Sequence, residues 1–157
     1  MILFPGSFDP FTKGHMNILK RTLNVFSEVG ILVVETKNKI PLEDRVNLIK
    51  ELLNEKKITN VKVEGYNGLL MDYCRNNNVK VLIRGIRNQN DYFFEQELEI
   101  INKKLYQEIE VFYLMTDLDK RYISSTLVWE YMKYKQDIKE LVNDNIKKYL
   151  ENNYEDL

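Results

Sequence analysis

Residues 2–15 have the sequence ILFPGSFDPFTKGH, and this stretch indicates the fold class of the chain. The apolar run at 2–5 predicts a strand that ends at Gly6, because glycine tolerates the sharp turn that must follow. A helical pattern begins at Gly14, with apolar residues recurring every three or four positions as far as Phe26. A strand, a turn and a helix in this order form the opening unit of an α/β domain.

The same alternation of short apolar runs and helical patterns continues along the chain. Repeated strand–helix units require parallel strands joined by right-handed crossovers. We therefore expect a doubly wound, Rossmann-like sheet of five parallel strands in the order 3-2-1-4-5, with C-terminal helices. After the first unit, strands are expected at 29–34, 60–64, 79–83 and 110–115, and helices at 42–53, 68–76, 91–105 and from about 124 onward.

Two expectations concern packing and domain organisation. In the helix at 91–105, the spacing of Phe94, Leu98, Ile101 and Leu105 predicts an inward apolar stripe. With no linker, repeat or low-complexity segment, residues 1–157 are expected to form a single domain, whose acidic helical tail from about 144 to 157 is frayed.

Composition excludes several classes of protein. The net charge of −1 lacks the basic excess typical of proteins that coat nucleic acid. One cysteine, Cys74, cannot form an intrachain disulfide, and one histidine, His15, excludes a metal site built on several imidazoles. The longest purely apolar stretch, 31–34, is far shorter than the roughly 20 residues of a membrane helix. We expect a soluble cytoplasmic protein that binds neither nucleic acid nor membrane.

The expected strand order brings two unusual segments together. It places the first and fourth strands side by side, so the segments 6–10 and 84–87 face the crevice where such sheets bind ligands. His15 opens a helix, where free N–H groups and the helix dipole favour phosphate oxygens. The chain contains neither a dinucleotide-binding fingerprint nor a Walker-type phosphate loop, which disfavours hydride transfer on nicotinamide and Walker-type hydrolysis.

The string from Gly6 to Pro10, followed by Gly14-His15, resembles the signature of the nucleotidyltransferase superfamily. Three later motifs are Arg84-Gly85-Ile86-Arg87, Asp91-Tyr92-x-x-Glu95 and Tyr122-Ile123-Ser124-Ser125-Thr126-Leu127-Val128. They resemble the motifs of bacterial phosphopantetheine adenylyltransferases, and the resemblance extends to about Asn143. It implies transfer of AMP from ATP to 4′-phosphopantetheine, giving dephospho-coenzyme A and pyrophosphate, the penultimate step of coenzyme A biosynthesis.

This resemblance implies a role for each matching residue. His15 and Lys39 would act on the phosphate in transit, with Lys37 as a competitor because the loop at 37–41 is shorter than usual. Arg84 would hold the acceptor phosphate, and Ser7, Lys39 and Leu70 would contact the acceptor. The ATP contacts would be Ser7, Phe8, His15, Gly85, Ile86, Arg87, Glu95, Lys120, Arg121, Tyr122, Ile123, Ser124, Ser125 and Thr126.

The chain departs from the family pattern at three places. Phe93 replaces a usual acidic residue. Lys120 and Arg121 stand where the family usually has an aromatic or polar residue, which leaves their effect on ATP affinity open. Thr126 replaces a serine but keeps the hydroxyl group.

Adenylyl transfer suits such a set of cations and hydroxyls. An ionised phosphate is already a nucleophile, so the reaction needs positioning and electrostatic support rather than a general base. Mg²⁺ would arrive on the phosphates of ATP rather than in a protein metal site.

The resemblance also implies partners, and two alternatives stay open. The family commonly forms hexamers, and coenzyme A is a candidate inhibitor. One alternative is a different superfamily enzyme with nicotinamide mononucleotide or a cytidylyl acceptor. The other is a non-catalytic sensor of nucleotide or coenzyme A.

Overall fold

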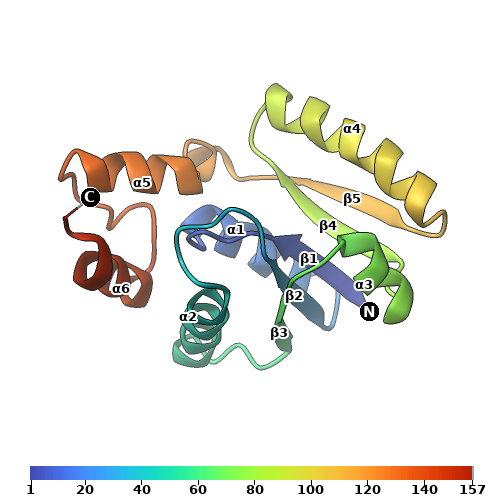
Figure 1. Ribbon diagram of the computed structural model, residues 1–157, viewed down its shortest axis with the longest axis horizontal. Helices are drawn as coiled ribbons and strands as arrows, with labels where there is room; N and C mark the ends of the chain where they lie inside the picture. Colours follow the sequence, from blue (N-terminus) through green and yellow to red (C-terminus); the bar gives the residue numbers. More distant parts are fainter. Residues whose placement is uncertain (157) are drawn as a thin grey trace.

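The computed structural model describes residues 1–156, which form a five-stranded parallel sheet covered by helices (Figure 1). The strand order is β3-β2-β1-β4-β5, so the predicted order 3-2-1-4-5 is confirmed. The strands are β1 (Ile2–Gly6), β2 (Val29–Val34), β3 (Val61–Tyr66), β4 (Val81–Ile86) and β5 (Glu110–Met115). The helices are α1 (Lys13–Leu23), α2 (Leu42–Glu55), α3 (Leu70–Asn76), α4 (Gln89–Leu105), the 3-10 turn η1 (Leu118–Lys120), α5 (Ser125–Lys133) and α6 (Asp144–Tyr154).

The register of the central strands opens a crevice at their carboxyl ends. β1 pairs with β2 as far as Gly6, but its ladder with β4 ends at Leu3. β4 meanwhile continues to pair with β5 up to Ile86. Beyond Leu3, β1 and β4 therefore leave space between them, at the switch point where doubly wound sheets bind ligands.

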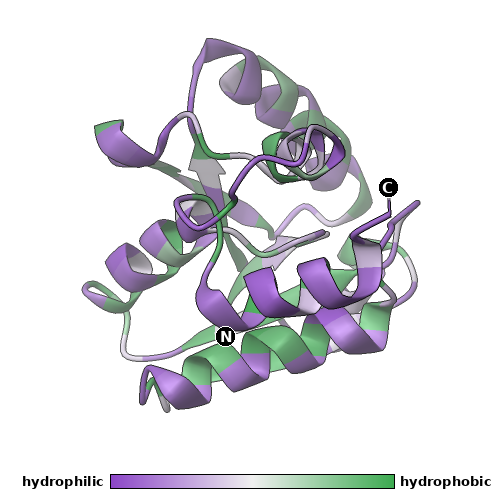
Figure 2. Cartoon of the chain, turned by 90° about the vertical axis from the view of Figure 1, so that its left-hand side faces the viewer, coloured by the Kyte–Doolittle hydropathy of each residue, from purple (hydrophilic) through white to green (hydrophobic). Residues whose placement is uncertain are grey.

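Alternate residues of the strands supply a core on each face of the sheet. Phe4 and Ile31 point to the larger cluster, which includes α1, α2 and the C-terminal helices. Their neighbours Leu3 and Leu32 point to a smaller cluster under α3. Figure 2 shows the matching pattern in the helices, where green apolar stripes lie beside purple polar ones.

The C-terminal tail forms a packed helix, α6, as far as Tyr154. The segment at 134–143 separates α5 from α6, and α6 packs beside α2 (Figure 1). Ile146 and Leu150 are fully buried, and the Tyr149 hydroxyl donates to Asp44 Oδ2 at 2.6 Å. The apolar spacing of α6 therefore anchors it despite its polar composition, while Leu157 lies outside the described residues.

The expected inward stripe of α4 is wrong. Phe94, Ile101 and Leu105 are 59%, 54% and 41% exposed, and only Leu98 of the four is half-buried. The one buried residue of α4 is Glu95. Periodicity detected an amphipathic helix, but it could not show that the apolar side faces away from the sheet.

Several element boundaries also differ from those expected. β4 begins two residues later and ends three residues later than the sequence indicated, so Arg84, Gly85 and Ile86 lie within the strand and only Arg87 follows it. α1 ends at Leu23 rather than Phe26. Within residues 1–156, no helix is long and apolar enough to cross a membrane.

Candidate active site

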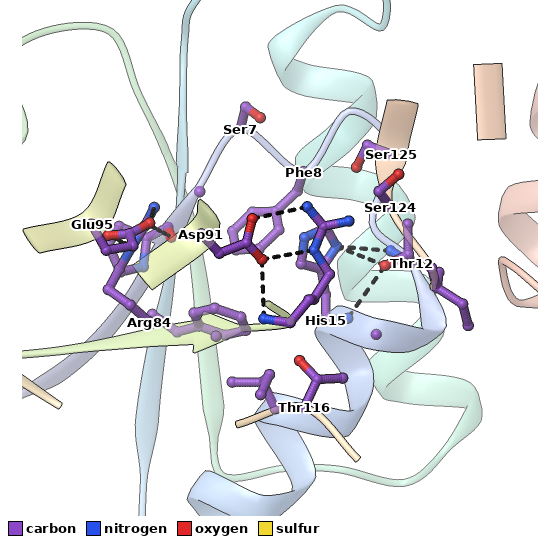
Figure 3. A pocket seen from close by; sticks show the side chains of 18 of the residues that line it. Ser7, Phe8, Thr12, His15, Arg84, Asp91, Glu95, Thr116, Ser124 and Ser125 are labelled. Carbon is purple, nitrogen blue, oxygen red and sulfur yellow. Dashed lines mark hydrogen bonds and ion pairs between the residues drawn. The ribbon is translucent and has the colours of Figure 1, made fainter. Parts of the chain in front are cut away.

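A cavity of about 340 Å³ lies at the crevice between β1 and β4 (Figure 3). Its walls come from the β1–α1 turn, the first turn of α1, the end of β4, the start of α4 and the start of α5. The candidate residues that line it are Ser7, Phe8, His15, Arg84, Gly85, Arg87, Glu95, Ile123, Ser124, Ser125 and Thr126.

The turn after β1 brings the main chain at Gly6 into close contact with the ring of Phe8. A Cβ atom at Gly6 would lie 2.8 Å from Cζ of Phe8, so glycine lets the ring fold back over the strand end. Phe8 itself has a φ of 47°, in the left-handed region that non-glycine residues seldom adopt. Such backbone strain clusters at ligand sites, because the surrounding structure must hold it in place.

His15 is locked in one tautomer by the N-terminal cap of α1. Thr12 Oγ1 accepts a hydrogen bond from His15 N at 3.3 Å, and Thr12 N donates to His15 Nδ1 at 2.9 Å, forming a capping box. An Nδ1 atom that accepts a main-chain N–H cannot carry the proton of a neutral ring. Nε2 therefore carries the proton and is the ring's donor.

The surroundings of His15 keep the ring uncharged. The rings of Phe8 and Phe11 lie 5.0 and 5.3 Å from it, centroid to centroid. Burial lowers the pKa of His15 to about 3, and the positive charges of Arg87 and Arg84 act in the same direction. The imidazole thus offers a neutral hydrogen-bond donor at neutral pH.

Arg84 reaches the cavity with its guanidinium group oriented by three bonds. Its Nε and Nη2 donate to the two carboxylate oxygens of Glu95, at 2.9 and 2.6 Å. Its Nη1 donates to the carbonyl of Pro5 at 2.7 Å, across the gap where the β1–β4 ladder has ended. This use of three of five N–H groups leaves two for a ligand.

Arg87 is held in a similar way just beyond the end of β4. Its Nε and Nη2 donate to Asp91 at 2.9 and 3.1 Å, and its main-chain N donates to the same carboxylate at 3.0 Å (Figure 3). The two carboxylates of the cavity thus orient the two arginines and offset their charges.

The first turn of α5 closes the opposite wall. Ser124 caps the helix by accepting from Leu127 N at 3.0 Å, and the Ser125 hydroxyl donates to the Pro10 carbonyl at 2.8 Å. Two serine hydroxyls are therefore committed to the fold, and the free N–H groups of this helix end remain as phosphate donors.

The structure does not bring six of the expected residues to this cavity. The Nζ atom of Lys39 lies 4.6 Å from the centroid of the Trp129 ring, while Ile86 is buried in the strand. Lys120 pairs with Asp119, and Arg121 donates to the Thr116 carbonyl. Outside the lining are Lys39, Leu70, Ile86, Lys120, Arg121 and Tyr122.

Leu70 instead lines a second cavity of about 190 Å³. This cavity also contains Leu98, Val111 and the amide of Asn102. Arg84 and Glu95 line both cavities, so the two spaces share one wall.

Some lining residues were not among the sequence candidates. Thr12 could have been found as the hydroxyl three residues before His15, a capping-box spacing. Thr116 is buried directly after β5, at the same edge of the sheet as the other strand ends. The further lining residues are Phe4, Pro5, Gly14, Ile18, Asp91 and Phe94.

The carboxylates of the site do not form a resident metal cage. Residues 1–156 contain no group of three or more His, Cys, Asp and Glu side chains that could hold a metal ion. In the cavity, Asp91 and Glu95 each face an arginine.

Comparisons with known proteins agree with the geometry. Residues 3–130 match the model of the cytidylyltransferase-like family. The phosphopantetheine adenylyltransferase of Dictyoglomus turgidum is 40% identical to the chain over 147 residues, which are 92% of this chain and 91% of that protein. That of Staphylococcus haemolyticus is 39% identical over 155 residues, 97% of this chain and 95% of that protein. The chain belongs to the phosphopantetheine adenylyltransferase family.

The family expected from the motifs is thereby confirmed. A solved structure supports the fold separately: a putative nicotinate-nucleotide adenylyltransferase from Vibrio parahaemolyticus superposes with a TM-score of 0.73 at 17% identity. The match covers 99% of this chain and 95% of that one. The matches to the phosphopantetheine adenylyltransferases likewise cover more than nine tenths of this chain.

Proposed function

We propose that this chain transfers the adenylyl group of ATP to 4′-phosphopantetheine. An oxygen of the acceptor phosphate forms a bond to the α-phosphorus of ATP, and the bond from that phosphorus to the bridging oxygen of the β-phosphate breaks. Dephospho-coenzyme A and pyrophosphate are the products. The observation that carries the proposal is the convergence of His15, Arg84 and Arg87 on one cavity at the switch point of the sheet.

In this proposal His15 supports the phosphorus in transit. Its Nε2–H donates to a non-bridging oxygen of the α-phosphate, where negative charge grows in the transition state. Because burial keeps the pKa near 3, this donor is present without change across the neutral range. The N–H groups left on Arg87 and at the α5 N-terminus bind the remaining phosphates of ATP.

Arg84 lies between the sites proposed for the two substrates. Its free N–H groups hold the acceptor phosphate, while the cavity around Leu70 takes the pantetheine arm. Leu98 and Val111 suit the apolar part of that arm, and the Asn102 amide suits its peptide-like groups.

The loop lysine of this proposal is Lys39, with Lys37 as the alternative. Lys39 Nζ lies over the Trp129 ring, so the proposal requires it to leave the indole when substrates bind. Mg²⁺ would enter with ATP and would offset negative charge on its phosphates, and this proposal assigns no protein side chain to hold it.

The proposal extends to the assembly and the setting of the reaction. Residues 1–157 act as a single domain in the cytoplasm, as a homo-oligomer that is a hexamer by family resemblance. The exposed apolar side of α4 supports association with a second copy of the chain. Coenzyme A, which shares the pantetheine arm of the product, is proposed as an inhibitor.

An acceptor panel tests the reaction. Pyrophosphate release is measured with purified protein, ATP and Mg²⁺, in the presence of 4′-phosphopantetheine or nicotinamide mononucleotide. A parallel reaction contains CTP and glycerol 3-phosphate. We expect release only with the first acceptor. Release with another acceptor would reassign the enzyme within its superfamily, and ATP binding without turnover would support the sensor alternative.

A further inference from the structure

Asn17 of α1 and Asp117 of the β5–α5 loop form a reciprocal pair. Asn17 Nδ2 donates to Asp117 Oδ2 at 2.7 Å, and the Asp117 main-chain N donates to Asn17 Oδ1 at 3.1 Å. Arg21, one turn along α1, places Nη1 3.3 Å from Asp117 Oδ1 and also donates to the Met115 carbonyl. Three side chains thus fasten this loop to α1.

The fastened loop leads directly into the cavity wall. Thr116, which lines the cavity, precedes Asp117, and its carbonyl accepts from Arg121 Nε at 2.8 Å. Lys120 N donates to the Asp117 carbonyl at 2.9 Å, and Ile123 N donates to the Lys120 carbonyl at 3.1 Å. A chain of hydrogen bonds therefore connects Asp117 to Ile123, which also lines the cavity.

Helix α1 carries both the catalytic candidate His15 and the loop contact Asn17. His15 lies two residues before Asn17 on α1, so the pair fixes the β5–α5 loop relative to the imidazole. We propose that Asn17 and Asp117 are positioning residues that set the distance between His15 and the cavity wall formed by Thr116 and residues 123–126. This inference rests on the proposed function, which assigns that wall to ATP.

The pair can be tested by exchanging its two members. Asn17→Asp sets two carboxylates against each other and removes the amide donor. The double variant Asn17→Asp/Asp117→Asn restores one amide and one carboxylate at the same positions. In that variant the main-chain N–H of residue 117 can still donate to a side-chain oxygen of residue 17. Because Asn17 is itself only partly buried, the exchange does not place the carboxylate in a fully buried position.

Binding of ATP by calorimetry, together with the Michaelis constant for each substrate, gives the readout. We expect Asn17→Asp to raise the dissociation constant and the Michaelis constant for ATP about tenfold, and the double variant to return both to within about twofold of the wild type. The Michaelis constant for the acceptor should change by less than about twofold, because the pair contacts only the nucleotide side. Asn54→Asp on the outer surface of α2 is the control for the added charge.

Two outcomes would overturn the inference. In the first, Asn17→Asp binds ATP with the dissociation constant of the wild type. In the second, the double variant binds ATP as weakly as Asn17→Asp does. If Asn17→Asp does not fold, Asp117→Ala replaces it, since it removes the bond from Asn17 Nδ2, together with the Arg21 ion pair, without changing a residue of α1. A wild type that binds ATP but releases no pyrophosphate would contradict the proposed function, while the binding measurements would still test the positioning role of the pair.

Discussion

A neutral imidazole at His15 gives the cavity a hydrogen-bond donor without adding a charge. Two arginines already supply positive charge there, and each shares it with a carboxylate. A protonated ring beside them would repel both guanidinium groups. The capping box, the phenylalanine rings and the arginines therefore act together to fix one protonation state and one tautomer.

Replacing His15 by glutamine keeps a side-chain acceptor for the helix cap but removes the titratable imidazole ring. Glutamine at this helix position can still accept from Thr12 N. In the wild type the folded-state pKa, about 3, lies below the ordinary value of 6.5, so the unfolded chain binds more protons between these values. Stability is then lost as the pH falls from about 6.5 toward 3.

We therefore expect the Tm of His15→Gln to decline less than that of the wild type as the pH falls from about 6.5 to 4. Turnover should drop by on the order of 10² because the oriented donor is gone. Thermal unfolding monitored by circular dichroism, and pyrophosphate release, provide the two measurements. Parallel Tm curves would argue against a titrating role for the ring.

The geometry of Arg84 matters more than its charge. Arg84→Lys keeps the cation but cannot donate to both oxygens of Glu95 and to the Pro5 carbonyl together. We expect the Michaelis constant for the acceptor to rise about tenfold or more, with a smaller change for ATP. Arg75→Lys, at an exposed pair with Asp72, is the matched control in the steady-state kinetics. Equal kinetics for both variants would contradict this role.

At the scale of elements, the strands were the part of the fold most open to prediction. Their apolar runs, bounded by breakers, placed all five and gave their order through the crossover rules. The end of β4 was missed because Arg84 and Gly85 look like loop residues. Yet a Cβ at Gly85 would lie 2.9 Å from Cγ1 of Ile18, so the strand contains glycine where α1 approaches it.

α6 is a helix whose burial the composition of the sequence did not indicate. Its composition is polar, but Ile146 and Leu150 fill the space beside α2. We expect Leu150→Ala to lower the free energy of unfolding by about 2–4 kcal/mol, through lost burial and a cavity. Asn152→Ala, on the exposed side of the same helix, should have little effect. Urea unfolding measures both, and equal values would indicate that α6 does not contribute to the cooperative core.

At the scale of the whole molecule, the sequence located the site better than it assigned the side chains. Topology predicted that the segments 6–10 and 84–87 meet, and residues from both line the cavity. It could not predict that Lys39 lies on Trp129, because that contact joins a loop to a helix 90 residues away. The carboxylate partner of Arg87 likewise depends on how α4 begins.

The uncovered side of α4 gives a prediction about assembly. Phe93, Ile100 and Ile101 are more than half exposed, an apolar surface that a second copy of the chain would cover. We expect Ile101→Glu to reduce the molar mass measured by light scattering after size exclusion. Tyr134→Glu, at a similarly exposed position beyond the end of α5, should leave it unchanged. A wild type that is already monomeric would refute the proposed association.

The wall shared by the two cavities has a thermodynamic consequence. Arg84 and Glu95 border both spaces, so a ligand in either one meets the same ion pair. If the first substrate to bind pulls the Arg84 guanidinium group toward itself, the second substrate meets an ion pair with a changed geometry. Linkage then makes the influence mutual: each substrate changes the affinity of the other by one common factor, whichever is added first.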